Sequence, residues 1–243
     1  MTQPDLEIES SDDLGGVWRV GFGPDMWAWT PWSYADDAGR FSGRWDDQSG
    51  EFRTLYTADS LLGCFLELLA QFRPSRSLLN ELDQIEDDDG SVEKFHEAAI
   101  GAVGYRWVEN RQFGSARQTG RYCYTTHSRT IAALIAHYPF ADHGLAARDV
   151  DSALLKEARD RVLTRSIARW LFNLSDNGDD LVDGVRFNSR HGDEIHMWAL
   201  FERPDDPPRS PKLEPTSEPT QVTPELSELQ EVFRRFGLHW DES

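Results

Sequence analysis

The spacing of hydrophobic residues predicts a strand that leads directly into a helix in the first third of the chain. Residues 52–58 (FRTLYTA) alternate between apolar and polar side chains, as a strand with one buried face does. Asp59 or Ser60 is placed to cap a helix that runs to about Phe72 and is stopped by Pro74. One broad side of this helix is apolar and is made of Leu61, Leu62, Phe65, Leu66, Leu68, Leu69 and Phe72.

Two more helices and a closing pair of strands follow from the same kind of pattern. Residues 128–138 and 151–173 are predicted to be helical. Residues 182–202 (VDGVRFNSRHGDEIHMWALFE) are predicted to form two strands around a turn at His191, Gly192 and Asp193. Strand segments near both ends with helices between them indicate an α+β domain with a mixed sheet, and not a regular βαβ repeat.

Composition divides the chain into four parts. Residues 1–13 are polar and acidic and are expected to be a disordered lead-in, whereas residues 14–203 are expected to form one folded domain. Residues 204–223, rich in Pro and acidic side chains, are expected to be a linker. Residues 224–243 hold a short amphipathic helix that ends at Gly237 and has one apolar face, made of Leu226, Leu229, Val232, Phe233 and Phe236. Such a helix either folds back on its own domain, the commoner case, or binds a partner.

Charge and cysteine usage narrow the classes of function. A formal charge of −18 argues against the basic face that nucleic acid needs, and against docking on anionic lipid. The chain opens without a basic and apolar leader, and no run approaches the roughly 18 apolar residues of a membrane span. We therefore expect a cytoplasmic protein with no nucleic-acid or membrane partner. Cys64 and Cys123 are the only cysteines, which excludes a disulfide framework and a cysteine-rich zinc site.

The common cofactor and catalytic motifs are missing from the sequence. Gly21-Phe22-Gly23 has Met26 where a dinucleotide-binding fingerprint needs its third glycine. The sequence has no P-loop, no HExxH and no GxSxG. We expect neither a metal centre nor a resident cofactor.

Three segments taken together resemble the RES domain family. They are residues 43–74, which include GRW and LYTADS, residues 161–172 (RVLTRSIARWLF) and residues 183–202, which include GVRFNSRHG. The resemblance extends over most of residues 17–203.

The family takes its name from an Arg, a Glu and a Ser, and in this sequence the matching positions are Arg44, Glu67 and Ser189. Tyr56 matches the aromatic residue at the end of the family's LY(x)A strand. Arg19, in GVWRVG, matches another arginine near the start of the domain.

The resemblance implies a fold like that of the ADP-ribosyltransferases and NAD⁺ as the substrate. Members of the family split off nicotinamide with water or phosphate as the acceptor, and several are toxins paired with a small antitoxin. For this chain it therefore implies NAD⁺ as ligand, phosphate as a candidate co-substrate, a cognate antitoxin as a candidate partner, and no cofactor beyond the consumed dinucleotide. Whether the chain forms a homo-oligomer stays open.

The proposed chemistry fits the residue types. Cleavage of the bond between nicotinamide and ribose leaves positive charge on the ribose, which the Glu67 carboxylate would stabilise. Arg19 and Arg44 would hold the pyrophosphate by charge-assisted hydrogen bonds. Tyr56 would border the nicotinamide, and Ser189 would bond the ribose or orient Glu67. Glu67, Arg44 and Ser189 form the expected catalytic set.

Each of these residues also has an ordinary structural interpretation. Glu67 falls on the wheel opposite the apolar side, beside Gly63, where a glutamate is usually solvated. The Ser189 hydroxyl, on the inward face of its strand, can bond its own turn. Tyr56 can be a core residue, and an arginine in a polar loop, such as Arg44, is usually solvated.

Two rival functions stay open beside NAD⁺ degradation. The chain can be an ADP-ribosyltransferase that modifies a protein or a small molecule, because the same residues would serve both reactions and only the acceptor differs. It can also be a non-catalytic NAD-binding sensor, or an interaction protein that uses its C-terminal helix. Release of nicotinamide separates the enzymes from the binding protein.

Overall fold

The computed structural model describes residues 3–11, 16–74, 101–157 and 161–241. The chain divides into two compact units, and each is assembled from segments that are far apart in the sequence. The first unit consists of Met1–Val17, Trp27–Asp59 and Ser115–Ser217. The second unit consists of Trp18–Met26, Ser60–Gly114 and Glu218–Ser243. This division differs from the single domain over residues 14–203 that composition suggested.

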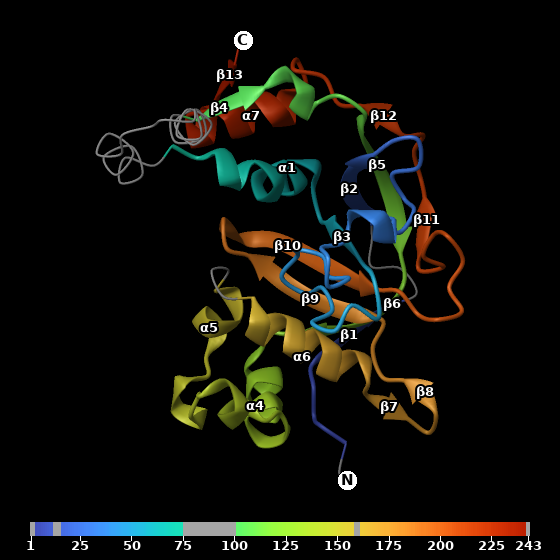
Figure 1. Ribbon diagram of the computed structural model, residues 1–243, viewed down its shortest axis with the longest axis vertical. Helices are drawn as coiled ribbons and strands as arrows, with labels where there is room; N and C mark the ends of the chain where they lie inside the picture. The colour runs from blue at the N-terminus through green and yellow to red at the C-terminus, as the bar shows by residue number, and fades with distance from the viewer. Residues whose placement is uncertain (1–2, 12–15, 75–100, 158–160, 242–243) are drawn as a thin grey trace. The chain divides into compact units, whose positions relative to one another are not determined.

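A mixed sheet is the core of the first unit (Figure 1). Five neighbouring strands of this sheet lie in the first unit: β1 (Ile8–Ser11), β3 (Thr54–Ala58), β6 (Gly120–Tyr124), β9 (Gly184–Ser189) and β10 (Gly192–Phe201). The order across the sheet is β1-β6-β9-β10-β3, in which β6 and β9 are parallel and the other neighbours are antiparallel. The predicted α+β class is confirmed, and so is the closing pair of strands, β9 and β10.

Helices of the first unit lie between these strands in the sequence. They are α4 (Ser128–His137), α5 (Ser152–Lys156) and α6 (Val162–Phe172), with the short 3-10 helices η1 (Trp32–Tyr34), η4 (Phe140–His143) and η5 (Ala147–Asp149). A small hairpin joins β7 (Ser175–Asp176) to β8 (Asp179–Asp180). The predicted helix over residues 128–138 is confirmed as α4. The stretch 151–173, predicted as one helix, instead holds the two helices α5 and α6. The first of them ends because the backbone adopts an extended conformation at Glu157.

Helix α6 covers one face of the first unit's sheet and lies along β9 (Figure 1). Phe172 at the end of α6 stacks on Phe52 with ring centroids 4.2 Å apart and meets Phe201 of β10 edge-on at 6.1 Å. Tyr56 of β3 pairs with Ala199 of β10, which lies on the same face as Phe201, two residues away. Tyr56 therefore projects from the face that α6 covers.

Three strands lie where composition suggested unstructured chain. β1 falls within the expected lead-in and pairs with β6. Within residues 204–223, β11 (Leu213–Pro215) pairs with the second half of β5 (Arg111–Gln118), and β12 (Thr220–Gln221) pairs with its first half. Strand pairing uses main-chain groups, so a segment with few apolar side chains can join a sheet.

The second unit packs two helices side by side, α1 (Leu61–Leu69) and α7 (Ser227–Phe236) (Figure 1). The unit also contains most of β2 (Gly16–Phe22), the first half of β5, and the following short elements: η2 (Ala70–Phe72), β4 (Ala102–Gly104), η3 (Tyr105–Trp107), β12 and β13 (His239–Asp241). β13 pairs with β4 in parallel. No helix within the described ranges is long and apolar enough to span a membrane.

The ends of these two helices follow from local capping. The Ser60 hydroxyl accepts a hydrogen bond from the Gly63 amide at 3.2 Å and so caps α1, as predicted. Gly237 ends α7 with a φ of +66°, a conformation that glycine adopts without strain. The buried side of α7 is Leu229, Val232 and Phe233. The C-terminal helix therefore folds back within its own unit, against α1.

We expect both cysteine thiols to resist labelling in the folded protein. Cys123 is fully buried and burial raises the pKa of its thiol to about 12, so only about 1 in 10⁴ molecules holds the reactive thiolate at pH 8. Cys64 is buried on α1 and its Sγ donates to the Trp18 carbonyl at 3.3 Å. Titration with a chromogenic disulfide should give two thiols in guanidinium and almost none without it. A Ser152→Cys variant, with its new thiol on exposed α5, should add one fast-reacting equivalent; fast labelling of the parent would contradict this expectation.

Candidate active site

The ring of Phe187 is the centre of a buried cluster in the first unit. Phe187 is 3% exposed and projects from β9 on the face covered by α6. The guanidinium carbon of Arg44 lies 5.4 Å from its ring centroid, within the range of a cation–π contact. The rings of Trp45 and Tyr56 lie 5.9 and 6.5 Å from the same ring. Phe187 thus joins two predicted site residues, Arg44 and Tyr56, that are twelve positions apart in the sequence.

Tyr56 holds the loop Gly43–Asp47 in place. Its hydroxyl accepts a hydrogen bond from the Trp45 amide at 2.9 Å and donates one to Asp46 Oδ1 at 2.9 Å. The other oxygen of Asp46 accepts from the Gly43 amide. A Cβ at Gly43 would collide with the Tyr56 hydroxyl and the Asp46 carboxylate, which is the reason for glycine at this position. The loop is therefore closed by its own carboxylate and by a phenol from β3.

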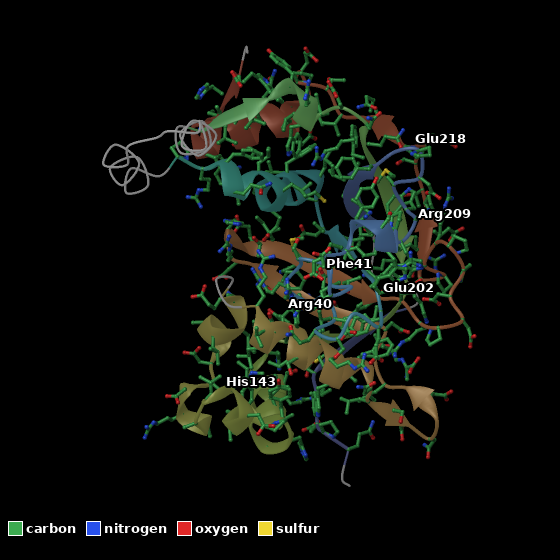
Figure 2. All side chains as sticks on the ribbon, in the orientation of Figure 1. Arg40, Phe41, His143, Glu202, Arg209 and Glu218 are labelled. Carbon is green, nitrogen blue, oxygen red and sulfur yellow. The ribbon has the colours of Figure 1, made fainter. Side chains whose placement is uncertain are left out.

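The chain on either side of this loop is also held by side chains. Phe41, labelled in Figure 2, lies just before the loop with its ring 5.4 Å from that of Trp32. After the loop, Arg53 pairs with Glu202, labelled at the end of β10 in the same view. Arg44 itself is only 8% exposed, so it is not the solvated loop arginine of the ordinary interpretation.

Burial and hydrogen bonding act in opposite directions on the Asp46 carboxyl. Its pKa is raised above 3.8, chiefly by burial, whereas the Tyr56 hydroxyl, the Gly43 amide and the positive charge of Arg165 work to lower it. The pKa of Tyr56 is raised well above 10.0, first by burial and then by the charge of Asp46, so its hydroxyl keeps its proton. A neutral phenol therefore bridges the loop to the sheet at all ordinary pH values.

Replacing Tyr56 by phenylalanine should destabilise the fold by about 1–3 kcal/mol at neutral pH, because a buried amide at Trp45 and a buried carboxylate at Asp46 each lose a partner. The Tyr56 hydroxyl stabilises the charged form of Asp46, so this part of its contribution is present above the carboxyl's raised pKa. It is lost as the pH falls through that pKa. Urea unfolding at pH 7 and at pH 4 measures both the cost and its decrease at acid pH.

Tyr124→Phe is the matched control for Tyr56→Phe. The Tyr124 hydroxyl donates a single hydrogen bond, to Asn188 Oδ1 at 3.1 Å, so its removal should cost about 0.5–1.5 kcal/mol with little dependence on pH. Equal costs for the two variants at both pH values would show that the Tyr56 hydroxyl does not hold the loop.

Ser189 is fully buried at the end of β9, on the same face as Phe187, as the period-two pattern predicts. Its Oγ accepts a hydrogen bond from the His191 amide at 2.9 Å. Ser189 therefore bonds its own turn, as its ordinary structural interpretation predicts. The contacts with ribose and with Glu67 that the family resemblance implies stay predictions.

Arginines of α6 that sequence reasoning did not select also contact the loop region. Arg165 Nε donates to the Gly43 carbonyl at 3.0 Å, and Arg169 Nη1 pairs with Asp47 Oδ2 at 3.1 Å. The available signal was the spacing of four residues between these arginines, which places both on one side of a helix. A helix-face pattern alone does not reveal which segment the face meets.

Arg19 and Glu67 belong to the second unit. Arg19, on β2, donates from Nε to the Met26 carbonyl at 2.7 Å, and burial lowers its pKa to about 10, which leaves it charged at neutral pH. Glu67, on α1, is half-buried, and Gly63 is buried. The side of α1 opposite its leucines is thus less open than the wheel suggested.

The first unit accordingly brings Arg44 and Tyr56 together around one ring and places Ser189 further along the same sheet face. Within the described part of the chain, no group of three or more His, Cys, Asp or Glu side chains is arranged to hold a metal ion.

Comparison with known proteins identifies the family. The model of the RES domain matches residues 16–222, and the chain belongs to the RES domain family. Among solved structures, the chain is similar to the crystal structure of the MbcT–MbcA toxin–antitoxin complex of M. tuberculosis, with a TM-score of 0.44 and 16% identity, over 89% of this chain and 87% of that one. No curated protein matches the sequence significantly.

Proposed function

We propose that the protein degrades NAD⁺ by cleaving the bond between nicotinamide and ribose, with water or phosphate as the acceptor. The observation that carries the proposal is the family match over residues 16–222, which spans all five candidate residues. The structure adds a reason to favour an anionic ligand, because Arg44 is a buried cation in a loop closed by Tyr56 and Asp46. A guanidinium presents a planar fork of N–H donors, and this fork matches the oxygens of a pyrophosphate.

The proposed reaction breaks one bond and forms one. The electron pair of the glycosidic bond leaves with nicotinamide, which becomes neutral, and the ribose takes on oxocarbenium character. The Glu67 carboxylate stabilises that charge, and Arg19 and Arg44 hold the pyrophosphate. Tyr56 borders the nicotinamide and Ser189 bonds the ribose. Water or phosphate then bonds the ribose C1, and an attacking water releases its proton to solvent.

Proton NMR of NAD⁺ incubated with the purified full chain tests this proposal. The reaction is run in buffers with and without phosphate, beside a Glu67→Ala variant that folds to the same thermal midpoint. Free nicotinamide with the parent and not with the variant supports the proposal, and the ribose product identifies the acceptor. No cofactor other than NAD⁺ is added, since none is proposed.

The other outcomes distinguish the rivals. Nicotinamide release together with a mass increase of a protein or small molecule would assign ADP-ribosyl transfer. Saturable binding of NAD⁺ with an unchanged spectrum in both buffers would overturn the enzymatic proposal in favour of an NAD-binding protein. If the protein neither binds NAD⁺ nor releases nicotinamide, both the enzymatic proposal and the NAD-binding alternative would be overturned.

A toxin role, with a cognate antitoxin as partner, is part of the same proposal. It rests on the membership of toxins in the family and predicts growth arrest with loss of cellular NAD⁺ when this chain is expressed alone. The Glu67→Ala chain, expressed at the same level, should permit growth. Normal growth with undepleted NAD⁺ on expression of the parent would contradict the toxin role while leaving the enzymatic test to stand by itself.

A further inference from the structure

Three arginines of the first unit lie along one side of α6. Arg161 at the helix start, Arg165 and Arg169 are spaced by four residues, and side chains with this spacing neighbour one another on a helix. All three contact the segment 42–51, which carries Arg44. Three arginine side chains of α6 therefore bind to a segment of only ten residues.

Two of these arginines bond to the main chain immediately before Arg44. Arg161 donates to the carbonyl of Ser42, and Arg165 donates from Nε to the carbonyl of Gly43 at 3.0 Å. A hydrogen bond from a charged donor is stronger than one from a neutral donor. The carbonyl of Gly43 belongs to the peptide group that leads into Arg44.

Arg169 acts further along, on side chains beyond Arg44. Its Nη1 pairs with Asp47 Oδ2 at 3.1 Å, and its other terminal nitrogen pairs with Glu51. Asp47 also accepts from the Glu51 amide at 2.5 Å. Arg169 therefore ties the loop to α6 without touching either peptide group that flanks Arg44.

The peptide groups on both sides of Arg44 are held by different elements. The preceding one is bonded at the Gly43 carbonyl by Arg165 from α6, and the following one is bonded at the Trp45 amide by Tyr56 from β3. Because peptide groups are planar, two fixed planes determine the φ and ψ of the residue between them. The direction in which the Arg44 side chain leaves the backbone is therefore set by Arg165 and Tyr56.

We propose that Arg165 is a positioning residue for substrate binding, which aims Arg44 at the pyrophosphate of NAD⁺ by holding the Gly43 carbonyl. This inference rests on the function proposed above and adds to it a residue outside the family's named set. The aim of a bidentate arginine clamp depends on its backbone direction, so the loss of Arg165 should weaken binding more than it slows the reaction step.

Steady-state kinetics of Arg165→Met and Arg169→Met provide the test. Each variant removes one cation from the same face of α6. Arg165→Met removes the hydrogen bond to the Gly43 carbonyl, whereas Arg169→Met removes the ion pairs with Asp47 and Glu51. We expect Arg165→Met to raise the KM for NAD⁺ about tenfold with kcat within about threefold of the parent, and Arg169→Met to leave KM within about threefold. Arg165→Lys, which keeps a charged donor, should restore most of the lost affinity. Thermal midpoints establish that each variant is folded, and if Arg165→Met is not, Arg165→Gln takes its place.

A double-mutant cycle separates positioning from general support of the fold. In an Arg44→Met background, the addition of Arg165→Met should change KM by less than about twofold, because the side chain that it aims is gone. The positioning role would be overturned if the KM increases of Arg44→Met and Arg165→Met multiply in the double variant. It would also be overturned if Arg165→Met and Arg169→Met change KM equally. In both cases the parent still releases nicotinamide, so the proposed function stands. If the parent neither binds nor cleaves NAD⁺, the proposed function and this inference fail together.

Discussion

Replacement of Glu67 by glutamine should lower nicotinamide release from NAD⁺ by at least about 100-fold. The substitution keeps the size of the side chain and removes only the negative charge, which is proposed to stabilise the developing positive charge on ribose. The loss of one such electrostatic contact typically costs a factor of about 10²–10³ in rate. Glu67 is half-buried on α1, a helix that Ser60 caps from the other end, so the variant should keep its fold.

Glu225→Gln is the matched control for Glu67→Gln, since it makes the same change of charge at an exposed position before α7. It should turn over NAD⁺ at the parent rate. Both variants should show the parent's thermal midpoint within a few degrees. If Glu67→Gln retained activity within about tenfold of the parent, a loss below about 1.4 kcal/mol, the assignment of Glu67 to the chemical step would have to be withdrawn.

Replacement of Phe187 by alanine should have the largest effect on stability, a loss of about 3–5 kcal/mol. The ring is 3% exposed and contacts Arg44, Trp45 and Tyr56, so its removal leaves a cavity beneath the loop and takes the aromatic face from a buried cation. The KM for NAD⁺ should rise as well, because Arg44 loses its support. Urea unfolding followed by tryptophan fluorescence measures the first effect, and nicotinamide release measures the second.

Two comparison variants bracket the effect of Phe187→Ala. Phe187→Leu fills most of the space and should cost less than alanine at the same position. Tyr34→Ala removes a large ring that is 76% exposed and should change stability by less than about 0.5 kcal/mol. A cost for Phe187→Ala close to that of Tyr34→Ala would mean that the loop does not depend on this ring.

Local signals predicted the elements whose boundaries are set by nearby residues. Ser60 caps α1 through a residue three positions on, and Gly237 stops α7 by its own left-handed backbone. The hairpin of β9 and β10 was predictable for the same reason, since its strands are joined by a tight turn after Ser189. Within residues 224–243, which were predicted to hold the C-terminal helix, α7 begins only at Ser227. A turn in which the Leu226 amide donates to the Thr223 carbonyl comes first.

Strands whose partners are distant in the sequence were not predictable from composition. β1 pairs with β6 more than a hundred residues away, and β11 pairs with β5 at a similar separation. These strands are only four and three residues long, and main-chain hydrogen bonds have no signature in the spacing of hydrophobic residues. The same limit applies to the division into two units, which depends on which distant segments contact one another.

By itself the sequence determined the α+β class, the cap and stop residues, and the resemblance that places Arg44, Glu67 and Ser189 in one family pattern. Only the tertiary structure decided what surrounds those residues. In the sequence, Asp46 looks like an ordinary loop acid and Phe187 like an ordinary strand residue. The structure shows that Tyr56 contacts both, because its hydroxyl bonds Asp46 and its ring meets that of Phe187. The physical reason is range: caps, turns and periodicity act over a few residues, whereas burial and buried hydrogen bonds arise between segments that only folding brings into contact.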